Sequence, residues 1–583
     1  MVPQVSRSLD TDVLILGSGG AGLFAALHAH QAPAGRARSL SITIAVKGLL
    51  GKCGCTRMVQ GGYNVALAKE DSVERHFMDT IEGGKWLPDQ ELAWQLVTLA
   101  VERIHELENE LGCFFDRNPD GTVHQKAFAG QSFDRTVHKG DLTGIEIINR
   151  LAEQVWARNI GRLEEHRAVE LIKNKAGDAI SGVLFIDMRT GEYVFVRAKA
   201  VLLATGGGPT MYRYHTPSGD KSCDGLAMAL RAGLPLRDME MVQFHPTGLL
   251  AGTHTRMTGT VLEEGLRGSG GHLLNGSKER FMPRYDAKAE RATRDVVSRS
   301  MFAEMRTGNT TPHGGLYISM SHLGADRVRK EFKGMVERCA DCGFDLAGGL
   351  VEVVPTAHYM MGGVEFRADC SSALPGLFVA GEDSGGVHGA NRLGGNGVAN
   401  STVFGAVAGD AMAAWVQGEA YRDPDTDAIA AAISRCELPF RKPRHSSENL
   451  EPAREKLYET MWERVGIIRD ASGMTAAQGE LAALAAALEA HGMDDEDRAF
   501  NLAWHDWMNL GNLVAVSQAI TAAALAREDS RGAHFRSDFP ETGALEGSSY
   551  TRIRENAGRL EISMHPVAFT RVRPGETLLK NAA

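Results

Sequence analysis

The feature that most constrains the fold is a short apolar segment that runs directly into a glycine-rich turn. Residues 11–16 read Thr-Asp-Val-Leu-Ile-Leu and predict a buried strand, and residues 17–22 read Gly-Ser-Gly-Gly-Ala-Gly. The apolar stretch from Leu23 to His30 then predicts a helix. Strand, Gly-x-Gly-x-x-Gly and helix in succession form the dinucleotide fingerprint, in which backbone N–H groups approach a pyrophosphate at the helix N-terminus. The sequence therefore predicts a Rossmann-like α/β domain.

Three further segments extend this prediction. Residues 41–46 predict a second strand, which ends in Lys47 and lacks the acidic residue that binds a ribose 2′-hydroxyl in the general fingerprint. Residues 200–207 and 376–383 each predict a buried strand that ends in a glycine turn, and the second of them delivers Glu382. We expect all three strands to belong to the dinucleotide-binding domain.

Length and charge limit the classes of protein that remain. A chain of 583 residues is too long for one core, so we expect two to four domains. The net charge of −10 argues against nucleic acid as a partner. No apolar run predicts a membrane span, and residues 1–8 lack a signal-peptide pattern, so we expect a cytoplasmic protein. The eight scattered cysteines, including the pair Cys339 and Cys342, are expected to be structural thiols, and we expect no metal site.

Two histidines and two arginines predict a site for a small dianion. They stand in four separate motifs: His245 in Gln-Phe-His-Pro-Thr-Gly, Arg294 in Thr-Arg-Asp, His358 in Thr-Ala-His-Tyr, and Arg392 in His-Gly-Ala-Asn-Arg-Leu-Gly. The arginine fork matches a carboxylate in a bidentate manner and stays charged at working pH. Histidine adds a donor that is neutral or charged near neutrality.

These motifs and their order resemble the flavoprotein subunit of the succinate dehydrogenase and fumarate reductase family, which also includes L-aspartate oxidase. The resemblance covers Asp12 to about Thr577. It implies a Rossmann-like FAD-binding domain in two parts (residues 1–237 and 355–430), interrupted by an α+β capping domain (238–354). A helical domain (431–545) and a short β tail (546–583) would follow.

The resemblance also implies a mechanism for interconverting fumarate and succinate. Arg294 would protonate one alkene carbon of fumarate while flavin N5 delivers hydride to the other. Glu264 and Arg267, from the family's Glu-Gly-x-Arg-Gly turn, would return a proton to Arg294. The substrate carboxylates would be held by His245, His358 and Arg392, with Phe128 beside them.

FAD is the cofactor that the resemblance implies, and Glu382 would hold its ribose. In most respiratory members a histidine bonds covalently to the flavin, and Cys55 stands at that position here. We therefore expect non-covalent FAD, which favours fumarate reduction over succinate oxidation, although the protein also tunes the potential by charge and hydrogen bonds. The expected cofactor-binding residues are Gly17, Ser18, Gly19, Gly20, Ala21, Gly22, Lys47, Cys55, Thr56, Gln60, Gly61, Gly62, Val169, Thr205, Gly206, Asp224, His358, Tyr359, Glu382, Arg392, Asn396 and Val398.

Three features bear on the substrate. L-Aspartate oxidases carry glutamate where this chain has Phe128, and an apolar ring leaves a substrate ammonium unpaired. Where relatives have Thr or Ser before Glu264, this chain has Glu263, which would repel a dianion unless it points away. Residues 251–260 look like an insertion, from which Thr258 or Thr260 could supply the missing hydroxyl. The alternative is an L-aspartate oxidase-like or other di- or tricarboxylate dehydrogenase.

The last third predicts helices over residues 450–471, 480–491 and 512–527, and a short alternating strand over 560–564. By resemblance this part is typical of complex-forming members, some of which add a membrane anchor, and it offers a docking surface for an iron–sulfur subunit. Any attachment at the inner face of the cell membrane would then run through such partners. A non-catalytic electron-transfer or assembly role would require loss of the pocket residues, which are present.

Overall fold

The computed structural model describes residues 4–31, 39–252, 255–443 and 450–579. The first three residues and positions 253–254 of the expected insertion lie outside these ranges. The largest sheet has seven strands in the order β6-β2-β1-β9-β8-β7, and β16 also pairs with β9. Its strands are β1 (Val5–Leu16), β2 (Ile42–Ala45), β6 (Gly161–Leu163), β7 (His166–Lys173), β8 (Ile180–Asp187), β9 (Glu192–Leu203) and β16 (Leu377–Val379).

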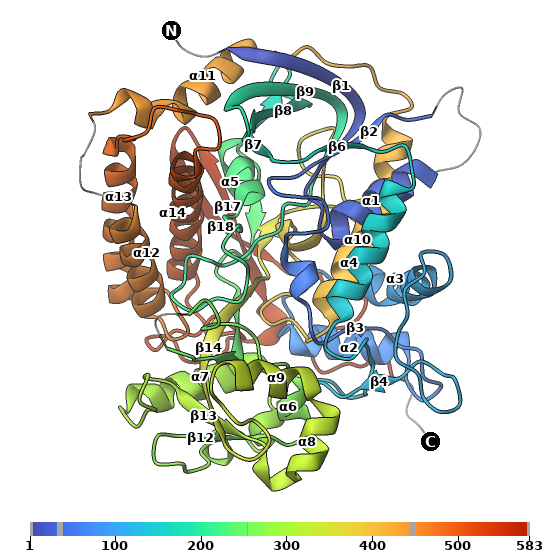
Figure 1. Cartoon of the computed structure of the whole chain (residues 1–583), viewed down its shortest axis with the longest axis vertical. Coiled ribbons are helices and arrows are strands. Elements are labelled where there is room, and N and C mark those ends of the chain that lie inside the picture. Colours follow the sequence, from blue (N-terminus) through green and yellow to red (C-terminus); the bar gives the residue numbers. More distant parts are fainter. Residues whose placement is uncertain (1–3, 32–38, 253–254, 444–449, 580–583) are drawn as a thin grey trace.

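The predicted Rossmann-like arrangement is confirmed around β1. Strands β2, β6, β9 and β16 join β1 in the parallel part of the sheet, whereas β8 pairs antiparallel with both β9 and β7. Strand β1 begins earlier than predicted, because residues 5–10 pair with β9 while remaining mostly exposed. The following helix, α1 (Gly20–Gln31), is apolar almost all round because it lies buried against α10 (Asn396–Trp415) (Figure 1).

A second hydrophobic core is formed by residues between 249 and 353. Its sheet has the order β11-β14-β13-β12 and is antiparallel throughout. This part lies at the bottom of Figure 1, in green to yellow. Its strands and helices are β11 (Val242–Leu249), β12 (His272–Leu274), β13 (Leu316–Ser319), β14 (Leu350–Met360), α6 (Gly265–Gly268), α7 (Arg294–Arg306), α8 (Ala325–Glu331) and α9 (Lys333–Asp341).

The C-terminal helices are present, but their predicted bounds were wrong. The segment predicted as one helix over 450–471 ends at Arg464 as α12 (Glu451–Arg464), and α13 (Ala471–Ala490) begins seven residues later. Asp470 causes this break, since its side chain accepts a hydrogen bond from the N–H of Gly473 and caps α13. Helix α14 (Leu502–Ala526) starts earlier than predicted, because Asn501 caps it by accepting from the N–H of Trp504.

Helix α14 is the one helix of the described ranges that is long and apolar enough to cross a membrane, and 67% of its most apolar window is buried inside the protein. It packs against α13 and α12, which makes it a core helix of the C-terminal region.

The tail forms β17 (Ser549–Asn556) and β18 (Arg559–Pro566), and β17 joins β10 (Leu236–Arg237) and β15 (Gly363–Val364) in a third sheet. The remaining elements near the site are α2 (Val73–Gly83), α3 (Gln90–Asn109), α4 (Thr143–Trp156), α5 (Asp224–Arg231), β3 (Tyr63–Asn64), β4 (Gln125–Lys126) and β5 (Thr136–Val137).

Candidate active site

A cavity of about 540 Å³ is lined by the carboxyl end of β1, the N-terminus of α1, and residues of β11 and β14. It also reaches the residues that follow β9 and β16, which are the glycine turns predicted from the sequence. In an α/β sheet, the crevice beyond the carboxyl ends of parallel strands is the usual ligand site. The predicted dianion residues His245, Arg294, His358 and Arg392 line the same cavity.

The glycine turn after β1 fits a pyrophosphate. A Cβ on Gly17, whose φ is +111°, would lie 2.1 Å from the carbonyl oxygen of Ala204. A Cβ on Gly22 would lie 2.0 Å from the carbonyl oxygen of Gly17. Glycine is therefore required at both positions by close backbone approaches. The turn leaves Gly19, Gly20 and Ala21 at the cavity wall, where helix N–H groups can receive a phosphate.

Two carboxyl groups, the half-buried Glu382 and the buried Asp383, follow β16 in the 3-10 turn η5 (Gly381–Asp383). Glu382 lines the cavity and accepts hydrogen bonds from the N–H groups of Met360, at 2.9 Å, and Gly208, at 3.3 Å. Asp383 accepts from the N–H of Gly206 at 3.1 Å and braces the glycine turn after β9. Burial raises the pKa of Glu382 to about 7 and the pKa of Asp383 to about 6.

These raised values predict how the stability of the FAD-free protein depends on pH. A carboxyl group whose folded-state pKa is raised stabilises the fold fully below its unfolded-state pKa, and this contribution is lost as pH rises through the folded-state value. For Glu382 that window runs from its ordinary value of 4.5 to about 7. We expect the melting temperature of the apoprotein to fall as pH rises through this range, and to fall less in Glu382→Gln. Scanning fluorimetry against an exposed control, Glu337→Gln, measures the difference, and equal slopes in both variants would contradict it.

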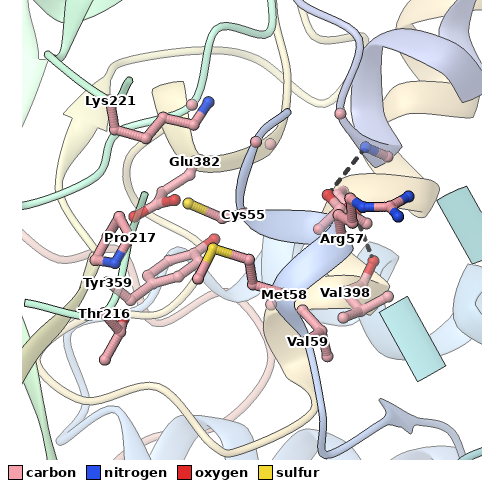
Figure 2. Close-up of a pocket in the computed structure, with 18 of the residues that line it drawn as sticks. Cys55, Arg57, Met58, Val59, Thr216, Pro217, Lys221, Tyr359, Glu382 and Val398 are labelled. Carbon is pink, nitrogen blue, oxygen red and sulfur yellow. Dashed lines mark hydrogen bonds between the residues drawn. The ribbon is translucent and has the colours of Figure 1, made fainter. Parts of the chain in front are cut away.

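The loop expected to cover the flavin forms the 3-10 turn η1 (Cys55–Met58) at the cavity wall. The Cys55 sulfur lies between Glu382 and Tyr359, below Lys221 (Figure 2). Burial raises the pKa of the Cys55 thiol to about 12, so the group is a neutral thiol. Lys221 donates a hydrogen bond to the carbonyl oxygen of Thr205 at 2.8 Å and brings a cation into this part of the cavity.

Most of the residues predicted to bind FAD line this cavity. Three predicted residues do not line it: Gly22, Val169 and Asn396. Val169 packs into the main hydrophobic core, and its neighbour Ala168 reaches the cavity instead. Asn396 accepts a hydrogen bond from the side chain of Asn64 at 2.9 Å. Those predicted residues that line it are Gly17, Ser18, Gly19, Gly20, Ala21, Lys47, Cys55, Thr56, Gln60, Gly61, Gly62, Thr205, Gly206, Asp224, His358, Tyr359, Glu382, Arg392 and Val398.

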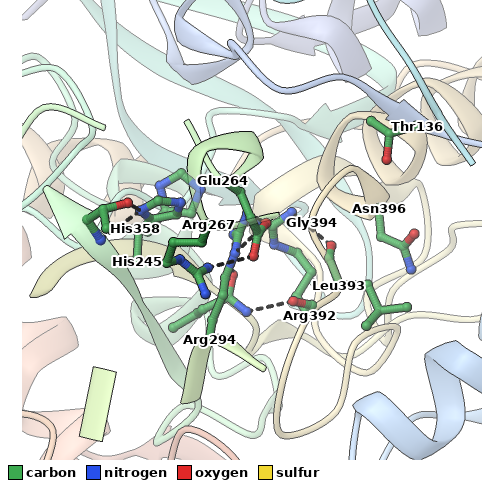
Figure 3. A network of polar contacts seen from close by, with 12 residues as sticks. Thr136, His245, Glu264, Arg267, Arg294, His358, Arg392, Leu393, Gly394 and Asn396 are labelled. Atoms are coloured by element: carbon green, nitrogen blue, oxygen red, sulfur yellow. Dashed lines mark hydrogen bonds and ion pairs between the residues drawn. The ribbon is translucent and has the colours of Figure 1, made fainter. Parts of the chain in front are cut away.

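The two predicted histidines line the same cavity and lie close together (Figure 3). The rings of His245, on β11, and His358, on β14, are 5.4 Å apart between centroids. Burial and the nearby Arg294 lower the pKa of both rings, so both are neutral imidazoles. The backbone N–H of Thr247 donates to Nδ1 of His245 at 3.3 Å, which leaves the ring proton on Nε2.

Arg294, Glu264 and Arg267 form a continuous chain of ion pairs (Figure 3). Glu264 Oε2 accepts from Nη2 of Arg294 at 2.6 Å, and Glu264 Oε1 accepts from Nη2 of Arg267 at 2.9 Å. Burial alone would raise the pKa of Glu264, but the two guanidinium groups hold it below its ordinary value. Arg294 and Glu264 line the cavity, whereas Arg267 lies behind them. Nη1 of Arg294 donates to the side chain of Gln243 at 3.0 Å.

Arg392 completes the cationic group. Its guanidinium lies 4.3 Å from the centre of the Tyr359 ring, and its buried Nε has no hydrogen-bond partner among the described residues. The three guanidinium groups and the carboxylate of Glu264 sum to a net charge of +2, because both histidines are neutral and the nearby Glu263 is paired with Lys126. A buried excess of two positive charges with an unpaired N–H donor is complementary to a dianion.

The structure also locates the features that bear on the substrate. Phe128 is buried and lines the cavity. Glu263 lines it too, and its side chain is paired with Lys126 at 3.1 Å. The hydroxyl of Thr258 is occupied by the carbonyl oxygen of Gly252, at 2.6 Å, so it is not the replacement hydroxyl. Thr260 lines the cavity, but its hydroxyl donates to the carbonyl oxygen of Met257 at 2.7 Å.

Two site residues were not predicted as such. Gln243 holds Arg294 and also donates to the carbonyl oxygen of Arg392 at 2.7 Å, so it links two of the site's cations. Its place two residues before His245, on the same strand, is the sequence signal that could have identified it. Lys126 lies two residues before Phe128, but nothing in the local sequence indicates its pairing with Glu263, which is 137 positions away.

Comparisons with known proteins agree with this geometry. The profile of the FAD binding domain family matches residues 12–398, and the profile of the fumarate reductase flavoprotein C-terminal family matches residues 454–578. The chain is 39% identical to a fumarate reductase (CoM/CoB) polypeptide of Methanothermobacter marburgensis, over 92% of this chain and 96% of that protein. It is 34% identical to the fumarate reductase flavoprotein subunit of Mycobacterium tuberculosis, over 97% and 98%. The FrdA chain of E. coli quinol fumarate reductase superposes with a TM-score of 0.91 at 32% identity, covering 98% of this chain and 99% of that chain.

Proposed function

This chain belongs to the fumarate reductase and succinate dehydrogenase flavoprotein family and is an FAD-dependent oxidoreductase of that type, and we propose that it interconverts fumarate and succinate. The observation that carries the proposal is the net charge of +2 formed by Arg294, Arg267, Arg392 and Glu264 beside the two neutral histidines. His245, His358 and Arg392 offer donors for the two carboxylates of such a substrate.

FAD, when bound along the glycine turn and Glu382, supplies the hydride chemistry of this enzyme class. The chain's own residues hold the substrate and handle the proton. Arg294 is the proton donor toward fumarate; Glu264, an ionised carboxylate, then takes a proton from Arg267 and passes it to Arg294 along the two ion pairs, and solvent replaces the proton of Arg267. Arginine is a weak acid for this task, because its ordinary pKa lies above about 12. The transfer becomes feasible because the accepting carbon is strongly basic and Glu264 lies 2.6 Å from the guanidinium.

The alternative substrate, L-aspartate, fits the cavity less well. Its ammonium would lie in a compartment that already carries an excess of two positive charges. Phe128 offers no countercharge, and the carboxylate of Glu263 is already paired with Lys126. An unpaired buried ammonium is costly. Assays of the two substrates on the same enzyme test the choice. We expect the enzyme to oxidise a reduced dye when fumarate is added. We expect L-aspartate not to reduce the oxidised flavin. Reduction of the flavin by L-aspartate, without turnover of fumarate, would overturn the proposal.

We propose that the FAD is not covalently attached. Cys55 stands at the expected attachment position as a neutral thiol, and a neutral thiol is a poor nucleophile. We expect acid precipitation of the holoenzyme to release all flavin into the supernatant, and Cys55→Ala to retain FAD in the same ratio to protein. Mass spectrometry of the precipitated chain provides the measurement. A flavin adduct on Cys55 that disappears in Cys55→Ala would refute the non-covalent state.

We further propose that electrons reach the flavin from an iron–sulfur partner subunit. The structural relatives support this, since the chain matches almost the full length of a quinol fumarate reductase flavoprotein chain. Among the described residues, no group of three or more His, Cys, Asp or Glu side chains is placed to hold a metal ion. Attachment to the inner face of a membrane would follow from such partners. Co-purification of a native complex tests this, and we expect iron and sulfide in it.

A further inference from the structure

Glu263 places a second carboxylate in the wall of the dianion compartment, by which we mean the part of the cavity formed by His245, Arg294, His358 and Arg392. It directly precedes Glu264, lines the same cavity as His245 and Arg294, and is only 5% exposed. A hydroxyl residue was expected at this position by resemblance, because it would bond a substrate carboxylate. A buried carboxylate facing a dianion is repulsive, and its uncompensated charge would reduce the net charge of the compartment from +2 to +1.

Lys126 neutralises the charge of Glu263 and does not itself line the cavity. Its Nζ lies 3.1 Å from Glu263 Oε2, and its side chain is 18% exposed. The same Nζ donates to the carbonyl oxygen of Gly140 at 3.3 Å and lies 5.8 Å from the centre of the Phe128 ring. Lys126 is not a wall residue of the cavity, whereas Glu263 and Phe128 are. The ammonium is therefore held in place by three groups and contacts Glu263 from outside the residues that line the cavity.

Other charges near Glu263 do not replace Lys126. Asp141 and Arg338, which also line the cavity, act on Glu263 with opposite signs. Arg338 is committed to the carbonyl oxygen of Val261 at 3.2 Å. Burial raises the pKa of Glu263, and Lys126 opposes this rise. The ammonium of Lys126 is thus the one countercharge in direct contact with Glu263 among the described residues.

We propose that Lys126 is a positioning residue that sets the substrate class, because it neutralises Glu263 and so keeps the compartment selective for dianions. With the pair intact, the compartment retains its net charge of +2 and accepts a dicarboxylate. Without the ammonium, Glu263 repels a substrate carboxylate and instead offers a partner for an ammonium. The pair therefore separates dicarboxylates from amino-dicarboxylates. This inference rests on the proposed function only for the identity of the natural dianion.

The test measures binding of malonate, a dianion that is not reduced, through the change it causes in the flavin absorbance of the holoenzyme. We expect Lys126→Met to weaken malonate binding at least about tenfold, which corresponds to about 1.4 kcal/mol or more. Lys126→Arg retains the charge and should bind malonate like the wild type. Adding Glu263→Gln to Lys126→Met removes the unpaired carboxylate and should restore most of the affinity. Lys139→Met, which removes a lysine paired with Asp116 at 3.3 Å, is the matched control and should leave binding unchanged.

Each outcome bears on the inference separately from the proposed function. Unchanged malonate binding in Lys126→Met, or weakened binding that Glu263→Gln does not restore, would overturn it. A wild-type enzyme that binds no malonate would also overturn it, since no dianion compartment would then exist. A wild type that binds malonate but does not turn over fumarate would refute the proposed function while the Lys126 result still decides the inference. FAD content and melting temperature of each variant identify a misfolded protein, and Lys126→Gln, which removes the charge but keeps a polar side chain, takes the place of Lys126→Met if that variant does not fold.

Discussion

Replacing Arg294 with lysine is expected to lower the fumarate turnover number by about 10²–10⁴-fold, the range that a general acid contributes to catalysis. Arg294 makes three directed hydrogen bonds, two to Glu264 and one to Gln243. A lysine ammonium is a compact charge without this planar fork, so it cannot keep both partners and also face the substrate. The charge of the compartment stays the same, and we therefore expect dianion binding and FAD content to change little.

The matched control for this variant is Arg299→Lys, on the same helix α7. Arg299 lies over the ring of Phe535 at 4.8 Å, and Glu264 and Gln243 bond Arg294 instead. Turnover and malonate binding of both variants, measured on holoenzyme with matched FAD content, separate loss of catalysis from loss of folding. Wild-type turnover in Arg294→Lys would rule out Arg294 as the proton donor.

Replacing Glu264 with glutamine is expected to lower the turnover number by about 100-fold, because an amide cannot return a proton to Arg294. The change also removes the carboxylate that lies between Arg294 and Arg267 and raises the net charge of the compartment from +2 to +3. A more positive compartment should bind a dianion at least as well as before. The expected signature is therefore a fall in kcat without a rise in KM.

Glu304→Gln is the matched control for the loss of a buried carboxylate. Glu304 is on α7, is 6% exposed and accepts a hydrogen bond from Arg284 at 2.7 Å, outside the cavity wall. Steady-state kinetics with fumarate, together with the solvent deuterium isotope effect on kcat, measure the difference between the two variants. A rise in KM with unchanged kcat in Glu264→Gln would mean that Glu264 serves binding and not proton transfer.

The sequence predicted well those features that depend on short-range constraints. The turn at Gly17 is an example, since its close approach to Ala204 excludes any side chain and so leaves a recognisable glycine spacing. The C-terminal helix boundaries were predicted less well. Apolar spacing continues from Leu457 to Val465, and the spacing cannot show that Asp470 starts a new helix by capping it. Local capping bonds, rather than periodicity, decided where those helices begin and end.

The gathering of the site residues could be predicted only through resemblance. His245, Arg294, His358 and Arg392 come from four segments, and no periodicity brings them together. The net charge of the site could not be predicted from the sequence either, because both histidines are neutral as a result of their burial beside Arg294. The pairing of Glu263 with Lys126 joins residues 137 positions apart. The sequence showed the anomalous carboxylate, and only the fold reveals its countercharge.

A single-turnover experiment tests most directly whether this cavity reduces fumarate. The purified holoenzyme is reduced chemically under anaerobic conditions and mixed with fumarate, while flavin absorbance and succinate are followed. We expect full reoxidation of the flavin with one succinate formed per FAD, and no such reoxidation in Arg294→Lys on the same timescale. A flavin that stays reduced in the presence of fumarate, yet is reoxidised by a different unsaturated acid, would contradict the proposed function and show that Glu263 and residues 251–260 have changed the substrate.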